Sequence, residues 1–515
     1  MQFGLIDYIV LAAYLIAVAI FGLKASGKQT STRDFFLGGD GIPWWAVLFS
    51  VVATETSTLT FISIPAVAYG GNLTFLQITV GYFIGRVVVA LYFLPKYFDG
   101  EMYTAYQFLE KRFGRTMRVA SSSTFMITRL LADGVRLFAT AIPLAIILRF
   151  GGAFLSWTDL ELYLLSISVI SVITLGYTFF GGIKAVVWMD VVQLGVYVGG
   201  ALLAMVILLN KLPDGWSTVT TFASPENKFQ VIRLGFDLPF KEFIAQPYTL
   251  ITAIIGGAVF SLASHGTDQL LVQRLLASGD LKSGQKALIW SGVVVMAQFA
   301  LFLIIGLMLY AFYEAQLPSE MGLSTNDEIF AKFIVEQLPV GISGLIVAAL
   351  FAAAMSSLSS SLNSLASATT FDVIKSFRTE VSTQAQDLKT SRIVTLIWGV
   401  ILTGSAFLFA VLQLQAGERP TVVELGLGIA SYTYGGLLGA FGLGMLFQKP
   451  DKTDAIVGFF TGLICLLFLV DGPVQNILPG DGLVLAWPLY TLIGSVIVIG
   501  VGWCSATIRQ TYVNN

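Results

Sequence analysis

The sequence predicts an all-α polytopic membrane protein. Of its 515 residues, 56% are apolar and only 12% are charged, about half the charged share of a soluble domain. Apolar stretches long enough to cross a bilayer as helices recur along the whole chain, whereas the alternating ten-residue segments of a membrane β-barrel are absent. A net charge of −2 and two cysteines without metal-ligand spacing argue against a nucleic-acid-binding protein or a disulfide scaffold.

Thirteen apolar stretches are candidate membrane spans. A membrane helix needs about 20 mostly apolar residues, and of these stretches only 455–471 is shorter than that. The sequence therefore predicts about 13 transmembrane helices. They cover 5–24, 44–67, 72–96, 119–148, 160–181, 187–210, 248–273, 287–313, 342–371, 393–413, 425–447, 455–471 and 486–508.

Lysine and arginine are unevenly distributed among the connecting segments. With the N-terminus outside, the cytoplasmic segments hold 19 of them, against three in the short outer loops, namely Arg149, Lys332 and Arg419. The loop 211–247 holds four more, but long loops count little in the positive-inside rule. The bias predicts N-terminus out and C-terminus in. The cytoplasmic segments are then 24–43, 96–118, 182–186, 274–286, 372–392, 448–454 and the tail after 508.

Charged residues also occur inside the predicted spans. A charge at bilayer depth costs roughly 2.5–3.5 kcal/mol, so such side chains should face a cavity or one another. Asp190 lies near the end of its span, which leaves three basic and two acidic residues deep in the membrane. This surplus of one positive charge indicates a cavity that would favour an anion. The residues are Arg86, Arg129, Arg136, Glu55, Asp133 and Asp190.

Two spans carry helix-breaking sequences. Within 44–67, the segment ATETSTLT from Ala53 to Thr60 is polar and Pro65 follows; within 248–273, Gly256-Gly257 precedes SLASHGTDQ. Unwound backbone at membrane depth lines a cavity or is buried in protein. Each break opens a block of five spans, which is typical of inverted repeats that hold a solute at the midplane. The expected units are 1–43, 44–211, 212–247 (an outer loop), 248–447 and 448–515.

A serine-rich span supplies oxygen ligands. In AAAMSSLSSSLNS, residues 352–364, the small residues Ala353, Ser356, Ser357 and Ser360 follow helical spacing and share one face. Hydroxyl and carbonyl oxygens suit hard cations such as sodium. Packing of small residues between membrane helices is the alternative explanation.

These segments resemble the sodium/solute symporters, which include bacterial sodium–galactose and sodium–sialic acid transporters. The resemblance rests on DFFLGG (34–39), GGIKAVVWMDVVQ (181–193), DQLLVQRLLA (268–277) and the serine segment. It implies a LeuT-type fold, in which one leading helix precedes two inverted five-helix repeats and about two helices follow. It also implies a main sodium site at Ala53, Thr56, Ala353, Ser356 and Ser357, and a candidate second site at Asp190, Ser359 and Ser360.

The amide and carboxylate residues that bind galactose in that family are replaced by other residue types here. Leu59, Thr60 and Thr79 stand at the aligned positions, so the pattern of intramembrane charges favours a carboxylate-bearing solute instead. A guanidinium binds a carboxylate through two parallel hydrogen bonds. The alternative is a sugar or polyol solute, with the arginines serving structure only. The candidate solute-binding residues are Glu55, Ser57, Thr60, Thr79, Arg86, Asp133, Arg136, Ser261, Ser264 and His265.

The expected function is secondary-active uptake of a small organic solute, driven by one or two sodium ions through alternating access. His265, the single histidine, titrates near neutral pH and keeps proton coupling open. No catalytic motif indicates an enzyme. The expected partners are the solute and membrane lipid, and no nucleic acid is expected to bind. The protein is expected to be a monomer in the inner membrane of a bacterium.

Overall fold

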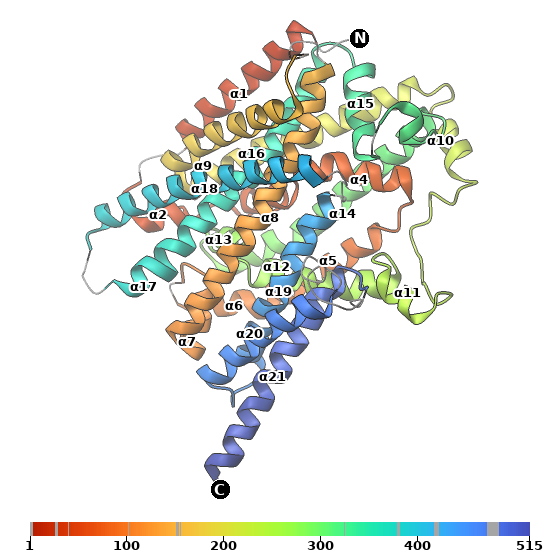
Figure 1. Cartoon of the computed structure of the whole chain (residues 1–515). Coiled ribbons are helices and arrows are strands. Elements are labelled where there is room, and N and C mark those ends of the chain that lie inside the picture. The colour runs from red at the N-terminus through yellow and green to blue at the C-terminus, as the bar shows by residue number, and fades with distance from the viewer. Residues whose placement is uncertain are drawn as a thin grey trace.

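The computed structural model describes residues 4–25, 29–39, 41–100, 102–150, 154, 156–323, 325–378, 382–416, 422–470 and 484–514. Its regular elements within these ranges are helices, as predicted (Figure 1). The α-helices are α1 Leu5–Ala25, α2 Thr32–Leu37, α3 Trp44–Glu55, α4 Thr58–Gly70, α5 Leu76–Val88, α6 Leu94–Tyr97, α7 Tyr106–Phe113, α8 Arg115–Phe150, α9 Asp159–Lys211, α10 Trp216–Ala223, α11 Phe240–Ala245, α12 Gly257–Gly266, α13 Gln269–Leu276, α14 Leu281–Phe312, α15 Asp327–Gln337, α16 Ile342–Ala368, α17 Lys375–Phe377, α18 Gln384–Ala416, α19 Val422–Leu446, α20 Lys452–Leu469 and α21 Pro488–Asn514.

Ten helices of the described chain are long and apolar enough to cross a membrane, and the bent pair α3 and α4 raises the number to eleven. Two segments account for the difference from thirteen. The 53 residues of α9 would extend about 80 Å at 1.5 Å per residue, twice what one crossing needs. The apolar helix Thr252–Gly266 is short. The count of thirteen spans stays a prediction, and the predicted outer loop with Arg419 lies outside the described residues.

The predicted cytoplasmic connection 182–186 lies within α9, at a kink that joins two helical parts. The chain turns there at Gly182, whose φ of 55° is non-helical. A side chain at this position would collide with the backbone carbonyl of Phe35 in α2. The predicted division into the spans 160–181 and 187–210 therefore coincides with this kink, and the residues after Gly182 are helical instead of forming a loop.

Both predicted breaks are present. The axes of α3 and α4 differ by 63°, and the two helices are separated by Thr56 and Ser57, both in extended conformation. Thr267 and Asp268 separate α12 from α13, and the Asp268 carboxylate caps α13 by accepting from Leu270 N. Hydroxyl and carboxylate side chains cap such ends because they satisfy backbone groups that the interrupted helix leaves unpaired.

The serine-rich helix α16 lies at the centre of the molecule. Every residue from Ile346 to Ala368 is buried, and the helix packs against α9, α8 and α18. Helices of the periphery, such as α1, expose apolar side chains instead, as lipid contact requires. The two termini lie at opposite ends of the molecule (Figure 1), which an odd number of spans would produce. The orientation itself stays a prediction.

Candidate functional site

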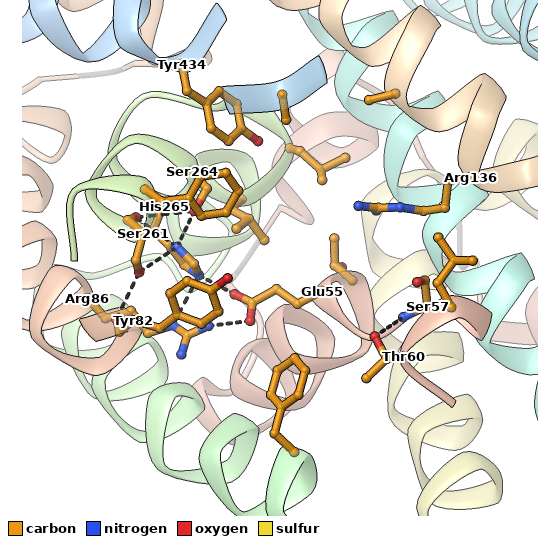
Figure 2. Close-up of a pocket in the computed structure, with 18 of the residues that line it drawn as sticks. Glu55, Ser57, Thr60, Tyr82, Arg86, Arg136, Ser261, Ser264, His265 and Tyr434 are labelled. Atoms are coloured by element: carbon orange, nitrogen blue, oxygen red, sulfur yellow. Dashed lines mark hydrogen bonds and ion pairs between the residues drawn. The ribbon is translucent and has the colours of Figure 1, made fainter. Parts of the chain in front are cut away.

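A cavity of about 140 Å³ lies beside the two helix breaks. Aromatic side chains form much of its wall, including Phe75, Tyr82, Phe260, Phe299 and Tyr434. Figure 2 shows the polar side chains that project into it from both broken segments and from α5 and α8. Eight of the ten predicted solute residues line it: Glu55, Ser57, Thr60, Arg86, Arg136, Ser261, Ser264 and His265.

The other two predicted solute residues lie outside this lining. Thr79 is buried in α5, where its hydroxyl donates to Leu76 O at 2.7 Å. Asp133 is buried under the wall and accepts a hydrogen bond from Ser361 Oγ at 2.6 Å. Thr79 therefore stabilises its own helix, and Asp133 joins α8 to α16.

Glu55, Arg86 and His265 form one hydrogen-bonded cluster at the wall (Figure 2). Arg86 Nη2 donates to Glu55 Oε2, and His265 Nε2 contacts the other carboxylate oxygen. Arg86 Nε lies 3.1 Å from the same imidazole nitrogen, while His265 Nδ1 lies 3.0 Å from Ser261 O. The carboxylate thus bridges two nitrogen groups that come from α5 and α12.

Gly85 allows α5 and α12 to approach closely at this cluster. A Cβ atom at Gly85 would collide with the carbonyl of Ala258 and would lie 2.8 Å from Ser261 Cβ. With only hydrogen there, α5 packs closely on α12, and Arg86, the next residue, reaches His265. Small residues allow close backbone approach between membrane helices in the same way.

The second arginine, Arg129, is paired by a residue that the sequence analysis overlooked. Its Nη2 lies 2.9 Å from Asp268 Oδ2 and 2.5 Å from the Tyr434 hydroxyl. Tyr434 in turn donates to Asp268 Oδ2 at 2.6 Å. Asp268 falls inside the predicted span 248–273, so counting acidic residues there would have found it. Its position next to the second helix break, where a carboxylate can cap the following helix, also marked it as a buried acidic residue.

The expectation of a surplus positive charge is therefore corrected. Around the cavity the three cations Arg86, Arg129 and Arg136 are balanced by Glu55, Asp133 and Asp268. Both arginines are almost entirely buried, with side-chain exposures of 4% for Arg129 and 1% for Arg86. Buried charges are tolerated when they are paired and hydrogen-bonded, and both guanidinium groups have such partners.

Arg136 differs from the other two arginines. Its guanidinium is 22% exposed and lines the cavity. Its ion-pair distance to Asp133 is 3.8 Å, longer than a hydrogen bond. Within the described part of the chain the guanidinium makes no hydrogen bond. Most of its five N–H donors are thus free to bind a solute.

A second, very small cavity lies between the first break and α16. Its volume is about 10 Å³, close to the space that a single water-sized particle needs. Four of the five residues predicted for the main sodium site line it: Ala53, Thr56, Ala353 and Ser356. The fifth, Ser357, has a buried hydroxyl without a hydrogen-bond partner. Gln193 and Tyr197 of α9 complete the wall, and sequence reasoning had not included them.

The candidate second sodium site contains a cation of the protein itself. Arg274 was assigned to a cytoplasmic loop, yet its side chain is fully buried. Its Nη2 donates to Ser360 Oγ and lies 3.4 Å from Asp190 Oδ2. Asp190 also accepts from Ser356 Oγ at 2.6 Å. The third predicted residue, Ser359, donates to Ser356 O. A sodium ion beside Asp190 would have to share the carboxylate with this guanidinium.

Comparison with known proteins agrees with this geometry. A model of the sodium:solute symporter family matches residues 35–462. The chain belongs to the sodium:solute symporter family. Such a symporter is a membrane transporter and not an enzyme, as the sequence indicated.

Among curated relatives, this symporter is 29% identical to the sodium/sialic acid symporter SiaT of Proteus mirabilis, over 98% of the chain and 95% of that protein. It is 30% identical to the sodium-dependent multivitamin transporter of Oryctolagus cuniculus, over 93% of the chain and 72% of that protein. Among solved structures, a Na⁺-coupled sialic acid symporter in a substrate-bound outward-open state superposes with a TM-score of 0.81, 27% identity and 98% coverage of both chains. The fold is thus that of a LeuT-type transporter.

Proposed function

We propose that this symporter imports a small carboxylate-bearing solute together with sodium. The observation that carries the solute class is Arg136, whose guanidinium faces the cavity with unused donors. A carboxylate can accept two parallel hydrogen bonds from one guanidinium, and such charged bonds are roughly twice as strong as neutral ones. A relative named for sialic acid transport supports the same class.

Charge balance supports an anionic solute as well. The ionised groups around the cavity sum to zero when His265 is neutral, because Arg86, Arg129 and Arg136 are matched by three carboxylates. Sodium then adds one positive charge in the adjacent small cavity. Because a charge at bilayer depth is costly, the carboxylate of a solute nearby would offset the charge of the sodium ion. Sodium and a carboxylate therefore favour each other's binding.

The proposed main sodium site consists of the carbonyl oxygens of Ala53, Thr56 and Ala353 with the hydroxyls of Ser356 and Ser357. A hydroxyl that donates to Asp190, as Ser356 does, keeps its lone pairs for a cation. Binding there would hold the first break against α16 and order the solute cavity. Alternating access would then involve the two five-helix units 44–211 and 248–447.

A sugar or polyol solute is the second candidate function. The favouring observation is that Arg86 and Arg129 are engaged with carboxylates, as a purely structural role requires. In that case Arg136 would only support Asp133. The aromatic walls and the hydroxyls of Ser57 and Thr60 would suit a neutral solute.

Binding to Arg136 variants decides between these functions. Thermal stability of the purified protein would be measured in sodium and in potassium, against sialic acid, short monocarboxylates, pantothenate, hexoses, inositol and proline. We expect a sodium-dependent rise with a carboxylate solute, lost in Arg136→Gln and partly kept in Arg136→Lys. Sodium alone should still stabilise both variants. A rise with a neutral sugar that survives Arg136→Gln would establish the sugar alternative.

A further inference from the structure

The Glu55 side chain is the most exposed member of its cluster. The side chains of Arg86 and His265 are 1% and 4% exposed, whereas 20% of the Glu55 side chain is exposed. In Figure 2 the carboxylate is turned toward these two partners, and Arg136 extends from α8 into the cavity on the other side of Glu55. All three side chains line the cavity, and Glu55 offers a solute the largest accessible surface of the three.

Glu55 keeps acceptor capacity for a solute. An ionised carboxylate has about four lone-pair sites and no donor. Arg86 Nη2 and His265 Nε2 contact one oxygen each, so each oxygen retains a further site. Groups that complement this surface are hydrogen-bond donors, namely hydroxyl, N–H and ammonium groups. A second carboxylate would meet a negative charge without a proton to share.

The cavity thus has two chemically opposite contact points on different helices. Arg136 of α8 offers donors with a positive charge, and Glu55 at the end of α3 offers acceptors with a negative charge. The volume of about 140 Å³ is near the roughly 150 Å³ that accommodates benzene. A compact molecule therefore fits between them. A longer one would extend past Ile64 and Phe75, which this cavity shares with a neighbouring, larger cavity of about 1000 Å³.

We infer that Glu55 is a specificity-determining residue that selects monocarboxylates bearing a hydroxyl or ammonium group at the end away from the carboxylate. This inference rests on the proposed function, in which Arg136 binds the carboxylate. A plain alkyl acid would cover Glu55 without giving it a donor, so the remaining lone-pair sites of the carboxylate would lose water and gain no partner. A dicarboxylate would add like-charge repulsion. Glu55 therefore disfavours both the alkyl acid and the dicarboxylate.

Four acids with the same four-carbon chain test this selection. Butyrate, 4-hydroxybutyrate, 4-aminobutyrate and succinate differ only at the fourth carbon, which is a methyl group in the first, bears a hydroxyl or an ammonium group in the next two, and is a carboxylate carbon in the last. Their dissociation constants for the full-length protein would be measured by thermal shift and calorimetry in sodium. The six-carbon series from hexanoate to adipate serves as a length control. We expect the hydroxyl or ammonium acid to bind about tenfold or more tightly than the alkyl acid, and the diacid most weakly.

Two variants assign the selection to Glu55. Glu55→Gln removes the negative charge and adds an amide donor, so the ratio between donor and alkyl acids should fall toward one and the diacid should gain. Arg136→Gln should weaken every acid by a similar factor and leave the ratio unchanged. The sodium-induced shift without solute shows that each variant is folded.

The outcomes separate the inference from the proposed function. If carboxylates bind but the alkyl acid or the diacid binds as tightly as the donor acids in both series, Glu55 does not select and the inference is wrong. An unchanged ratio in folded Glu55→Gln overturns it too. If no carboxylate binds while a neutral sugar does, the proposed carboxylate transport is wrong, and the inference that rests on it is wrong as well. If Glu55→Gln does not fold, the order of the wild-type series still decides.

Discussion

Ser357→Ala should change stability in opposite directions without and with sodium. The Ser357 hydroxyl is buried and has no hydrogen-bond partner. An unsatisfied buried polar group costs about 1–3 kcal/mol, so its removal should raise the stability of the sodium-free protein by about 1 kcal/mol. In sodium the same hydroxyl is a proposed ligand. A tenfold weaker sodium affinity would remove about 1.4 kcal/mol of stabilisation when sodium is saturating.

The assay is thermal unfolding of purified protein in potassium and across a sodium titration. We expect the variant to melt at a higher temperature than wild type in potassium, with a smaller sodium-induced rise. Ser364→Ala is the matched control, because Ser364 lies on the same buried helix but its hydroxyl donates to Ser361 O at 3.1 Å. This control should lower the melting temperature equally in both salts.

Either of two results would refute the reasoning. A variant that is less stable than wild type in potassium would show that the Ser357 hydroxyl has a partner in the sodium-free protein. A sodium titration that matches wild type would remove Ser357 from the ion site. In the second case the 10 Å³ cavity would need other ligands, and Gln193 and Tyr197 in its wall would be tested next.

Three further predictions concern structure. Asp268→Asn should destabilise the protein by about 3 kcal/mol, the low end of the cost of breaking a buried ion pair, because it removes the carboxylate at 2.9 Å and leaves the buried Arg129 with the longer contact of 3.5 Å to Asp133; unfolding in denaturant would show this. Gly182→Ala should lower the melting temperature, since a methyl group there collides with a backbone carbonyl of α2; an unchanged value would mean that the kink can relax. Hydrogen bonds from Ser283 hold the pKa of Asp280 below its ordinary value, so this N-cap of α14 is intact above about pH 4 and its contribution is lost as pH falls below the lowered pKa. An Asp280→Ala variant should cost about 1 kcal/mol at neutral pH and little in acid, which a pH series of melting curves would check.

Much of the architecture could be predicted from local sequence. The polar segment from Ala53 to Thr60 indicated a break, and the structure has one at Thr56 and Ser57. The run after Gly256-Gly257 indicated a second, which is present at Thr267 and Asp268. Such breaks are predictable because glycine, proline and hydroxyl side chains weaken a helix wherever the helix lies. The kink at Gly182 falls in the predicted connection 182–186 between two spans.

The pairing of charges could not be predicted in the same way. Arg274 lies near the end of a predicted span, and only the fold shows that its side chain reaches Asp190 and Ser360. Asp268 and Arg129 are far apart in sequence and meet because α8 and the second break pack together. The sequence therefore suggested a surplus positive charge, whereas the structure supplies Asp268 as a further counter-charge and leaves Arg136 with free donors.

By itself, the sequence determined the membrane class, the two breaks and the serine-rich face of one helix, since these follow from composition and helical spacing. Only the tertiary structure decided which arginine lines the cavity with free donors and that Glu55 is the most exposed member of its cluster. The reason is physical: the energy of a charged group at membrane depth depends on its nearest partners, and those partners come from helices that are distant in the chain.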